Sequence, residues 1–179
     1  MAVDAFIWFE QPGVGEKPEG ETLDDTYSKN KAFEIKDFSF GVENPTTIGS
    51  ATGGAGAGKI KFNEFTIKKT TDQASPLFFK NCCAGVHYGS VTIAMRKAGG
   101  DPNSSGKEFL RFKFDTVFTT KIDWSGPGDE GPEESVTFVY GKLGVKYTPQ
   151  EGTGKAGGNA KLAGWDQVKN KSEDGFVDS

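Results

Sequence analysis

Cysteine and histidine are scarce in this sequence, and their scarcity argues against several kinds of chemistry. The 179 residues include two cysteines, the neighbours Cys82 and Cys83, and one histidine, His87. Adjacent cysteines rarely bridge each other because the geometry strains the backbone, so we interpret them as small buried residues in a reducing compartment. One histidine beside two adjacent cysteines lacks the spacing of a zinc site.

Long apolar runs and clusters of basic residues are also missing. No stretch approaches the ~20 apolar residues that span a bilayer. The opening MAVDAFIWFE lacks the basic region and cleavage site of a secretory signal. The net charge is −4, with Lys and Arg scattered along the chain, which disfavours binding to a phosphate backbone. We therefore expect no nucleic-acid partner and no membrane partner.

Catalytic motifs are absent or incomplete. The stretch GGAGAGK (residues 53–59) begins like a phosphate-binding loop, but Ile60 stands where Ser or Thr is required, and a strand is expected next instead of a helix. No serine lies in a GxSxG elbow. The acidic residues of SGPGDEGPEE (125–134) lack the calcium-loop pattern and are expected to be solvated turn residues. We predict that the protein is not an enzyme and holds no cofactor or metal.

Phenylalanine and glycine, by contrast, are abundant, with 15 and 25 residues respectively. This combination is typical of aromatic strands joined by tight turns. The clearest strand runs from Lys107 to Trp124 and alternates throughout, which predicts one buried and one wet face. A strand of this length is expected to bend or to contain a bulge.

Three other segments alternate and then slip by one residue. The slips fall at Lys36–Asp37, Asn63–Glu64 and Gly141–Lys142. A slip of this kind indicates a β-bulge or a strand that passes from one sheet to another. Three of them favour a tightly curved sandwich or a closed or nearly closed barrel.

One short helix interrupts the strands. Asp72 or Ser75 is predicted to cap it, Pro76 fits its first turn, and Gly85 is predicted to end it. We therefore expect residues 1–179 to form one mainly β domain, a compact β-barrel of two curved antiparallel sheets with one short α-helix. Long loops are expected at 11–31 and 44–58, and a flexible tail after about residue 166.

The loop at 44–58 has almost no charge, and leaving it undocked would be costly in conformational freedom. Docking on another copy is the simplest explanation, and a head-to-tail contact of this sort makes rings or filaments. The predicted contact residues are Asn44, Pro45, Thr46, Thr47, Ile48, Gly49 and Ser50.

Several motifs, spread in order over nearly the whole chain, resemble one known family. They are MAVDAF at the start, Gly58 and Lys59 before FTI (65–67), DQASP (72–76), VTIAMRKAGG (91–100), the strand pair EFLRFKFDTVFTTKI and ESVTFVYGKLGVKYTPQ, and the closing GWD (164–166). In this arrangement the chain resembles the haemolysin-coregulated protein (Hcp) family, which forms the inner tube of type VI secretion systems.

The resemblance implies a β-barrel subunit with one helix that closes into six-membered rings. It also implies that the rings stack into a tube inside a contractile sheath, which expels the tube. The implied partners are further copies of the chain, the sheath and spike proteins, and small effector proteins in the ring lumen. The expected location is cytoplasmic before firing, followed by secretion without a cleavable signal peptide. The 11–31 segment and the tail depart from the family pattern.

Two alternatives remain open from the sequence. One is a monomeric β-sandwich module that binds a ligand or carbohydrate through exposed aromatic residues such as Trp8 or Trp124. The other is a small hydrolase that uses Cys82 or Cys83 with His87. The sequence also leaves open which face of the Lys107–Trp124 strand lines a lumen.

Overall fold

The computed structural model of the chain describes residues 3–12, 16–46, 58–97, 106–149 and 157–179. Strands dominate these residues, with one α-helix and two short 3-10 helices. In chain order the elements are β1 (Val3–Pro12), η1 (Ser28–Asn30), β2 (Phe33–Glu34), β3 (Asp37–Ser39), β4 (Val42–Glu43), β5 (Lys61–Phe62), β6 (Phe65–Thr70), α1 (Ser75–Ala84), β7 (His87–Lys97), β8 (Lys107–Gly128), β9 (Gly131–Val139), β10 (Lys142–Tyr147), β11 (Lys161–Asp166), β12 (Lys171–Ser172) and η2 (Asp174–Asp178).

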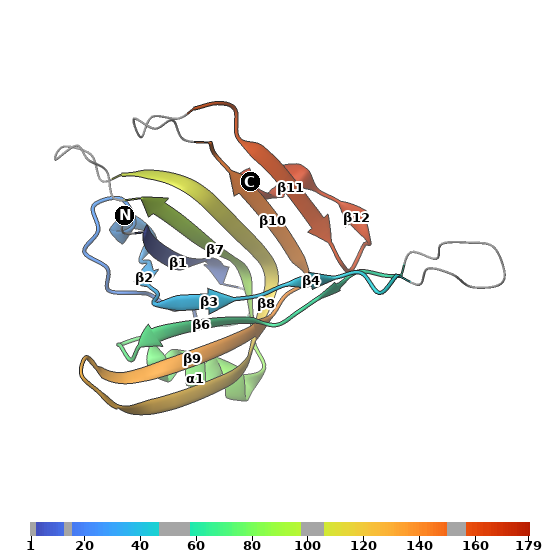
Figure 1. The fold of residues 1–179 in the computed structure, drawn as a ribbon. Coiled ribbons are helices and arrows are strands. Elements are labelled where there is room, and N and C mark those ends of the chain that lie inside the picture. The colour runs from blue at the N-terminus through green and yellow to red at the C-terminus, as the bar shows by residue number, and fades with distance from the viewer. Residues whose placement is uncertain (1–2, 13–15, 47–57, 98–105, 150–156) are drawn as a thin grey trace, which may run out of the picture.

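Ten of the strands form one antiparallel sheet that curls over itself into two layers (Figure 1). The main layer has the strand order β12-β11-β10-β8-β7-β1-β2. The second layer consists of β3, β6 and β9, and it joins the main layer where β9 pairs with the second half of β8. Strands β4 and β5 form a separate two-stranded arm. The mainly β fold with one short helix confirms the predicted fold class.

The three phase slips fall between strands. Lys36–Asp37 separates β2 from β3, Asn63–Glu64 separates β5 from β6, and Gly141–Lys142 separates β9 from β10. At the first slip the chain leaves the ladder with β1 and enters the ladder with β6. Backbone N–H groups of Ile35 and Lys36 donate to Ala5 and Lys68 at 3.1 and 2.8 Å. These two bonds connect the layers and leave the barrel nearly closed.

The long strand β8 does not keep one face buried, so that expectation is wrong. Phe114 points into the core, but Thr116 adopts a left-handed conformation with φ of 55°. After it the alternation shifts by one residue, and Val117 points into the core instead. Opposite this corner, the N–H of Gly141 donates to the carbonyl of Asp115 at 3.0 Å. The bend therefore lets β8 belong to both layers.

Stacked aromatic rings fill the space between the layers. The rings of Phe65 and Phe114 lie parallel with centroids 4.5 Å apart, and both side chains are completely buried. Phe9, from the main layer, meets Tyr88 and Phe78 edge-on at 4.8 and 5.5 Å. Such pairs add about 0.5–1.5 kcal/mol each beyond the apolar area that they bury.

Helix α1 lies against the second layer and begins and ends much as predicted (Figure 1). Pro76 lies in its first turn and Gly85 ends it with φ of 64°. The N-cap is Ala74, and the Asp72 carboxylate accepts the N–H of Ala74 at 2.9 Å. The expectation of two buried cysteines is wrong. Cys83 is exposed and Cys82 is half-buried, because the buried residues of this helix include Phe78 and Asn81.

The stretch after residue 166 is ordered into elements, in contrast to the predicted flexible tail. It forms β12 and η2, and Val177 within it is 1% exposed. Acidic residues of this stretch pair with lysines of β10, and other residues of the stretch pack on the glycine backbone of β10 and β11. These contacts depend on how the strands pair, so the sequence alone does not reveal them. In the described ranges, no helix has both the length and the apolar character to cross a membrane.

Candidate assembly surface

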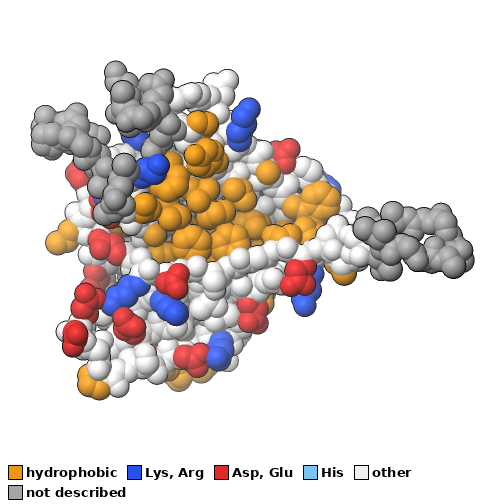
Figure 2. Space-filling model, viewed as in Figure 1, with side chains coloured by type: hydrophobic (Ala, Val, Ile, Leu, Met, Phe, Trp, Pro, Cys, Tyr) orange, Lys and Arg blue, Asp and Glu red, His pale blue; other side chains and the backbone are white. Residues whose placement is uncertain are grey.

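An apolar surface lies open between β3 and strands β8 and β10 (Figure 2). It is the inner face of the main layer where that layer extends past the second layer. In the ladder of β8 and β10, Val145 faces Phe112 and Tyr147 faces Leu110. We call this surface the apolar face. Its residues are the half-buried or exposed side chains Ala5, Phe38, Phe40, Leu110, Phe112, Val145 and Tyr147.

Tyr147 is the most exposed residue of the apolar face, with 48% of its surface accessible. Phe112 and Val145 pack on the core with one side and reach the surface with the other. Contiguous apolar patches of this kind mark sites of protein association. Phe40 stands at the rim and meets the ring of Phe112 edge-on, with centroids 4.8 Å apart.

The two-stranded arm β4–β5 projects from the barrel beside the apolar face (Figure 1). Its base is fixed by Phe62, whose ring stacks on Tyr140 at 5.1 Å and whose N–H donates to Gln167 at 2.8 Å. Val42, which pairs with Phe62 across the arm, is 49% exposed. The arm thus carries the described residues 44–46 away from the barrel.

Three of the predicted contact residues lie on this arm and are exposed: Asn44, Pro45 and Thr46. The other four, Thr47, Ile48, Gly49 and Ser50, fall outside the described residues. The role of all seven in contacts between copies stays a prediction.

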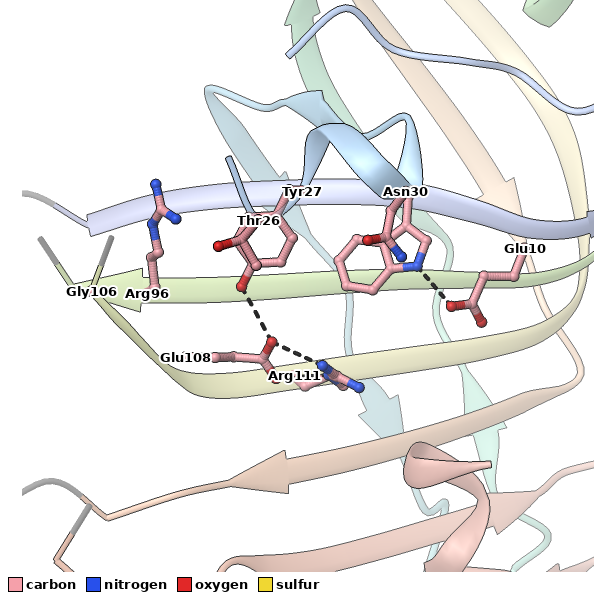
Figure 3. A pocket seen from close by; sticks show the side chains of 9 residues that line it. Glu10, Thr26, Tyr27, Asn30, Arg96, Gly106, Glu108 and Arg111 are labelled. Atoms are coloured by element: carbon pink, nitrogen blue, oxygen red, sulfur yellow. Dashed lines mark hydrogen bonds and ion pairs between the residues drawn. The ribbon is translucent and has the colours of Figure 1, made fainter. Parts of the chain in front are cut away.

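The outer face of the main layer is polar, and it holds a cavity of about 280 Å³ (Figure 3). Tyr27 covers one side of the cavity and donates to Glu108 at 3.2 Å. Glu108 pairs with Arg111 at 2.7 Å, and the Arg111 guanidinium lies 5.9 Å from the Trp8 ring. Arg96 pairs with Asp24. These charged groups face partners within the chain, so we interpret the cavity as structural.

Trp8 is therefore unsuited to the sugar-binding role considered from the sequence. Tyr27 packs on its ring with centroids 5.6 Å apart, and only 4% of Trp8 is exposed. Burial, together with the nearby Glu108 carboxylate, raises the pKa of Tyr27 above its ordinary value. Trp124 is 50% exposed, but its indole N–H donates to Glu134 at 2.9 Å.

A buried polar network lies where α1 meets the barrel. Lys69 and Glu134 face each other across β6 and β9, with Nζ and Oε1 2.6 Å apart, and each residue is at most 2% exposed. The expectation that Glu134 is a solvated turn residue is wrong. Glu134, Val136 and Phe138 are alternate residues of β9, and the last two point into the core. The alternation along this strand therefore already predicts that Glu134 is buried.

The residues considered for catalysis do not form a nucleophilic site. Burial and the neighbouring Cys83 raise the pKa of the Cys82 thiol, which disfavours the reactive thiolate. His87 packs on the ring of Phe118 with centroids 5.3 Å apart. Over the described ranges, no three His, Cys, Asp or Glu side chains gather as a metal site. The residues after Lys59 enter strand β5, so the glycine-rich stretch lacks the helix that a phosphate-binding loop needs.

Comparison with known proteins places these features in context. A family model described as "Type VI secretion system effector, Hcp" matches residues 6–147. The protein hcp1 of Pseudomonas aeruginosa is 29% identical over 113 residues, which cover 63% of this chain and 68% of that protein.

Solved structures agree in fold over almost the whole chain. The structure of a type six secretion system protein superposes with a TM-score of 0.83 at 28% identity, and covers 96% of this chain and 100% of the other. Hcp1 from Salmonella typhimurium superposes with a TM-score of 0.74 at 23% identity, over 97% of this chain and 100% of the other. The second likeness is evidence of the shared fold alone.

Proposed function

The chain belongs to the Hcp family of type VI secretion system proteins, and on this premise we propose that it is a structural subunit of the inner tube. Six copies close into a ring, and rings stack into a tube that contraction of the sheath expels. In this role the protein has no enzymatic activity. It waits in the cytoplasm and leaves the cell with the tube, without cleavage of a signal peptide.

The observation that carries this proposal is the apolar face beside a projecting arm. Burying a side chain such as Val145 or Phe112 fully is worth about 1.5–3 kcal/mol relative to leaving it exposed. Most side chains of the apolar face are already half-buried, so a neighbouring copy that covers the face would gain the remaining part of this energy at each of them. Because the arm and the apolar face are different surfaces, contacts between them are head-to-tail, and such contacts close into rings when the rotation allows.

The polar outer face of the main layer suits the lumen of such a ring. Arg111 and Asp115 lie on this side of β8, opposite Lys146 and Lys142 of β10, and both side chains stay partly exposed. A water-filled channel requires a polar wall, which the outer face supplies. The inner face of the same layer cannot supply it, because its side chains form the core and the apolar face. Small effector proteins would meet this wall, while the sheath and spike proteins meet other surfaces of the tube.

Electron microscopy of the purified full-length protein tests the proposal. We expect ring-shaped particles with six-fold symmetry, and stacked rings at higher protein concentration. Sedimentation of the same sample should give a hexamer whose population rises with concentration. A strict monomer at high concentration, with no rings in the images, would count decisively against a tube subunit.

A further inference from the structure

The C-terminal segment Lys171–Ser179 forms a strap that first pairs with the edge of β11 as β12 and, from Glu173 on, lies across the outer face of β10 and β11. Gly144 and Gly164 face each other in the ladder of these two strands and form a floor without side chains. A Cβ atom on Gly164 would lie 2.2 Å from the Glu173 carbonyl oxygen, and one on Gly144 would lie 3.0 Å from Cβ of Val177. The strap therefore rests directly on the backbone, in a recess that we call the strap groove.

Lysines form the rim of the strap groove. Nζ of Lys142 lies 2.5 Å from Glu173, and Nζ of Lys146 lies 2.6 Å from Asp178. The Phe176 ring sits close to Lys142 and Lys113, with centroid distances of 4.6 and 5.4 Å. Lys113 also donates to the main-chain carbonyl of Ser179. The groove thus recognises carboxylates, an aromatic ring and a main-chain carbonyl.

Two hydrogen bonds hold the start of the strap to Gly164 of β11: the N–H of Glu173 donates to the Gly164 carbonyl at 2.9 Å, and the N–H of Gly164 donates to the Asp174 carboxylate at 3.0 Å. The helix η2 of the strap has five residues, and Val177 is its one buried side chain. The ion pairs of Lys142 and Lys146 with the strap remain partly exposed, so salt screens them and each stabilises the closed strap only modestly. Segments with few buried contacts open without unfolding the rest of a protein.

We propose that the strap groove is a peptide-binding site, masked in the free chain by the strap. Its ligand is an acidic segment of a partner protein that carries an aromatic side chain next to a β-branched one. The strap itself displays this chemistry, with Glu173, Phe176, Val177 and Asp178 as the contacting residues. The proposal goes beyond tube assembly, because every residue of the groove belongs to one chain.

A labelled peptide with the sequence KSEDGFVDS (residues 171–179) serves as the probe in a fluorescence-anisotropy titration. In the full-length double variant Glu173→Lys/Asp178→Lys, the strap is repelled by Lys142 and Lys146 while the groove is unchanged. We expect this variant to bind the peptide at least about tenfold more tightly than the wild type, because the closed strap reduces the fraction of competent protein.

Two controls make the titration specific. Adding Lys142→Gln and Lys146→Gln to the double variant should abolish binding, and a peptide with Ser in place of the Phe and Val should not bind. Equal affinity of wild type and double variant for the peptide, or binding that survives the lysine changes, would overturn the proposal. If unlabelled wild-type chain competes efficiently with the labelled peptide, the groove binds the strap of a second copy. That result would overturn the proposal of a separate partner protein.

Hydrogen exchange of the wild-type protein gives a second measurement that needs no variant. Saturating peptide should speed the exchange of amides in residues 171–179 while the amides of β10 and β11 stay protected. Exchange of the strap that is unchanged at saturating peptide would contradict displacement. Because neither measurement depends on rings, failure here and failure of the tube proposal are separate results.

Discussion

Glu134 accepts hydrogen bonds from three different elements. Lys69 of β6 donates at 2.6 Å, Ser75 of α1 at 2.9 Å, and Trp124 of β8 at 2.9 Å. Lys69 also lies 5.3 Å from the centroid of the Phe33 ring. A buried charge is tolerated when it is paired and its remaining bonds are made. At the scale of single residues, this network fastens the helix to the barrel.

Replacing Glu134 by Gln removes from β9 the carboxylate that faces the buried Lys69. Because the Asp72 carboxylate still pairs with Lys69 at 3.0 Å, we expect a loss of about 1–3 kcal/mol in the free energy of unfolding, less than for a fully broken buried pair. Urea denaturation measures the loss. The matched control is Glu133→Gln, which removes an exposed partner of Lys36 and should cost at most about 1 kcal/mol. Equal losses in the two variants would show that the network does not fasten the helix.

Asp24 pairs with Arg96, whose guanidinium lies against the ring of Tyr27. Burial raises the pKa of this carboxyl, but the bonds from Arg96 and from the backbone of Tyr27 and Thr26 outweigh burial and hold it below 3.8. A pKa that is lower in the folded state than in the unfolded state stabilises the protein above the unfolded value. This contribution disappears as the pH falls through the folded value.

The variant Asp24→Asn should therefore be less stable than the wild type at pH 5–7. The difference should shrink as the pH falls below the ordinary carboxyl pKa of 3.8. Thermal unfolding at several pH values measures this, with the exposed neighbour variant Asp25→Asn as control. A difference that stays constant down to pH 2 would show that Asp24 acts through something other than its charge.

At the scale of elements, β8 decides the shape of the barrel. Its first half pairs with β7 and β10, and its second half pairs with β9. Strands β9 and β10 follow each other along the same edge of β8, and the gap between them lies opposite Thr116. The left-handed Thr116 thus forms the corner at which both ribbons turn from one layer into the other.

Because left-handed backbone is costly for a β-branched residue, glycine should suit the corner better. We expect Thr116→Gly to raise the free energy of unfolding by about 0.5–1 kcal/mol. The matched change Asp123→Gly, at an exposed residue in the regular ladder between β8 and β9, should lower it by a similar amount. Urea denaturation of the two variants measures both signs. A loss at both positions would argue against strain at Thr116.

At the scale of the whole molecule, the two faces of the main layer differ in polarity. Its inner face supplies the core and then the open apolar face, whereas its outer face carries charges that are paired with one another. Short segments cover parts of the outer face, with Tyr27 near one end and the strap near the other. An assembly that buries the apolar face leaves the polar side for water.

Tyr147→Glu places a charge on the apolar face and should abolish ring formation. Tyr147 is already 48% exposed, so the barrel itself should unfold at nearly the same temperature as the wild type. Leu23→Glu, at a residue that is 97% exposed and lies outside the strands and the apolar face, is the control and should leave rings intact. Sedimentation and electron microscopy measure ring formation. Rings formed by the Tyr147→Glu variant would show that the contact between copies does not involve the apolar face.

The sequence by itself determined the mainly β fold, the single helix, the positions of the strand breaks and the family. These follow from local periodicity, from turn residues such as Gly85, and from ordered motifs. Tertiary structure alone decided that Thr116 reverses the face of β8, that Lys69 is the partner of Glu134, and that the C-terminal strap lies on Gly144 and Gly164. Each of these depends on which residues face each other across strands far apart in the chain, and local alternation does not contain that register.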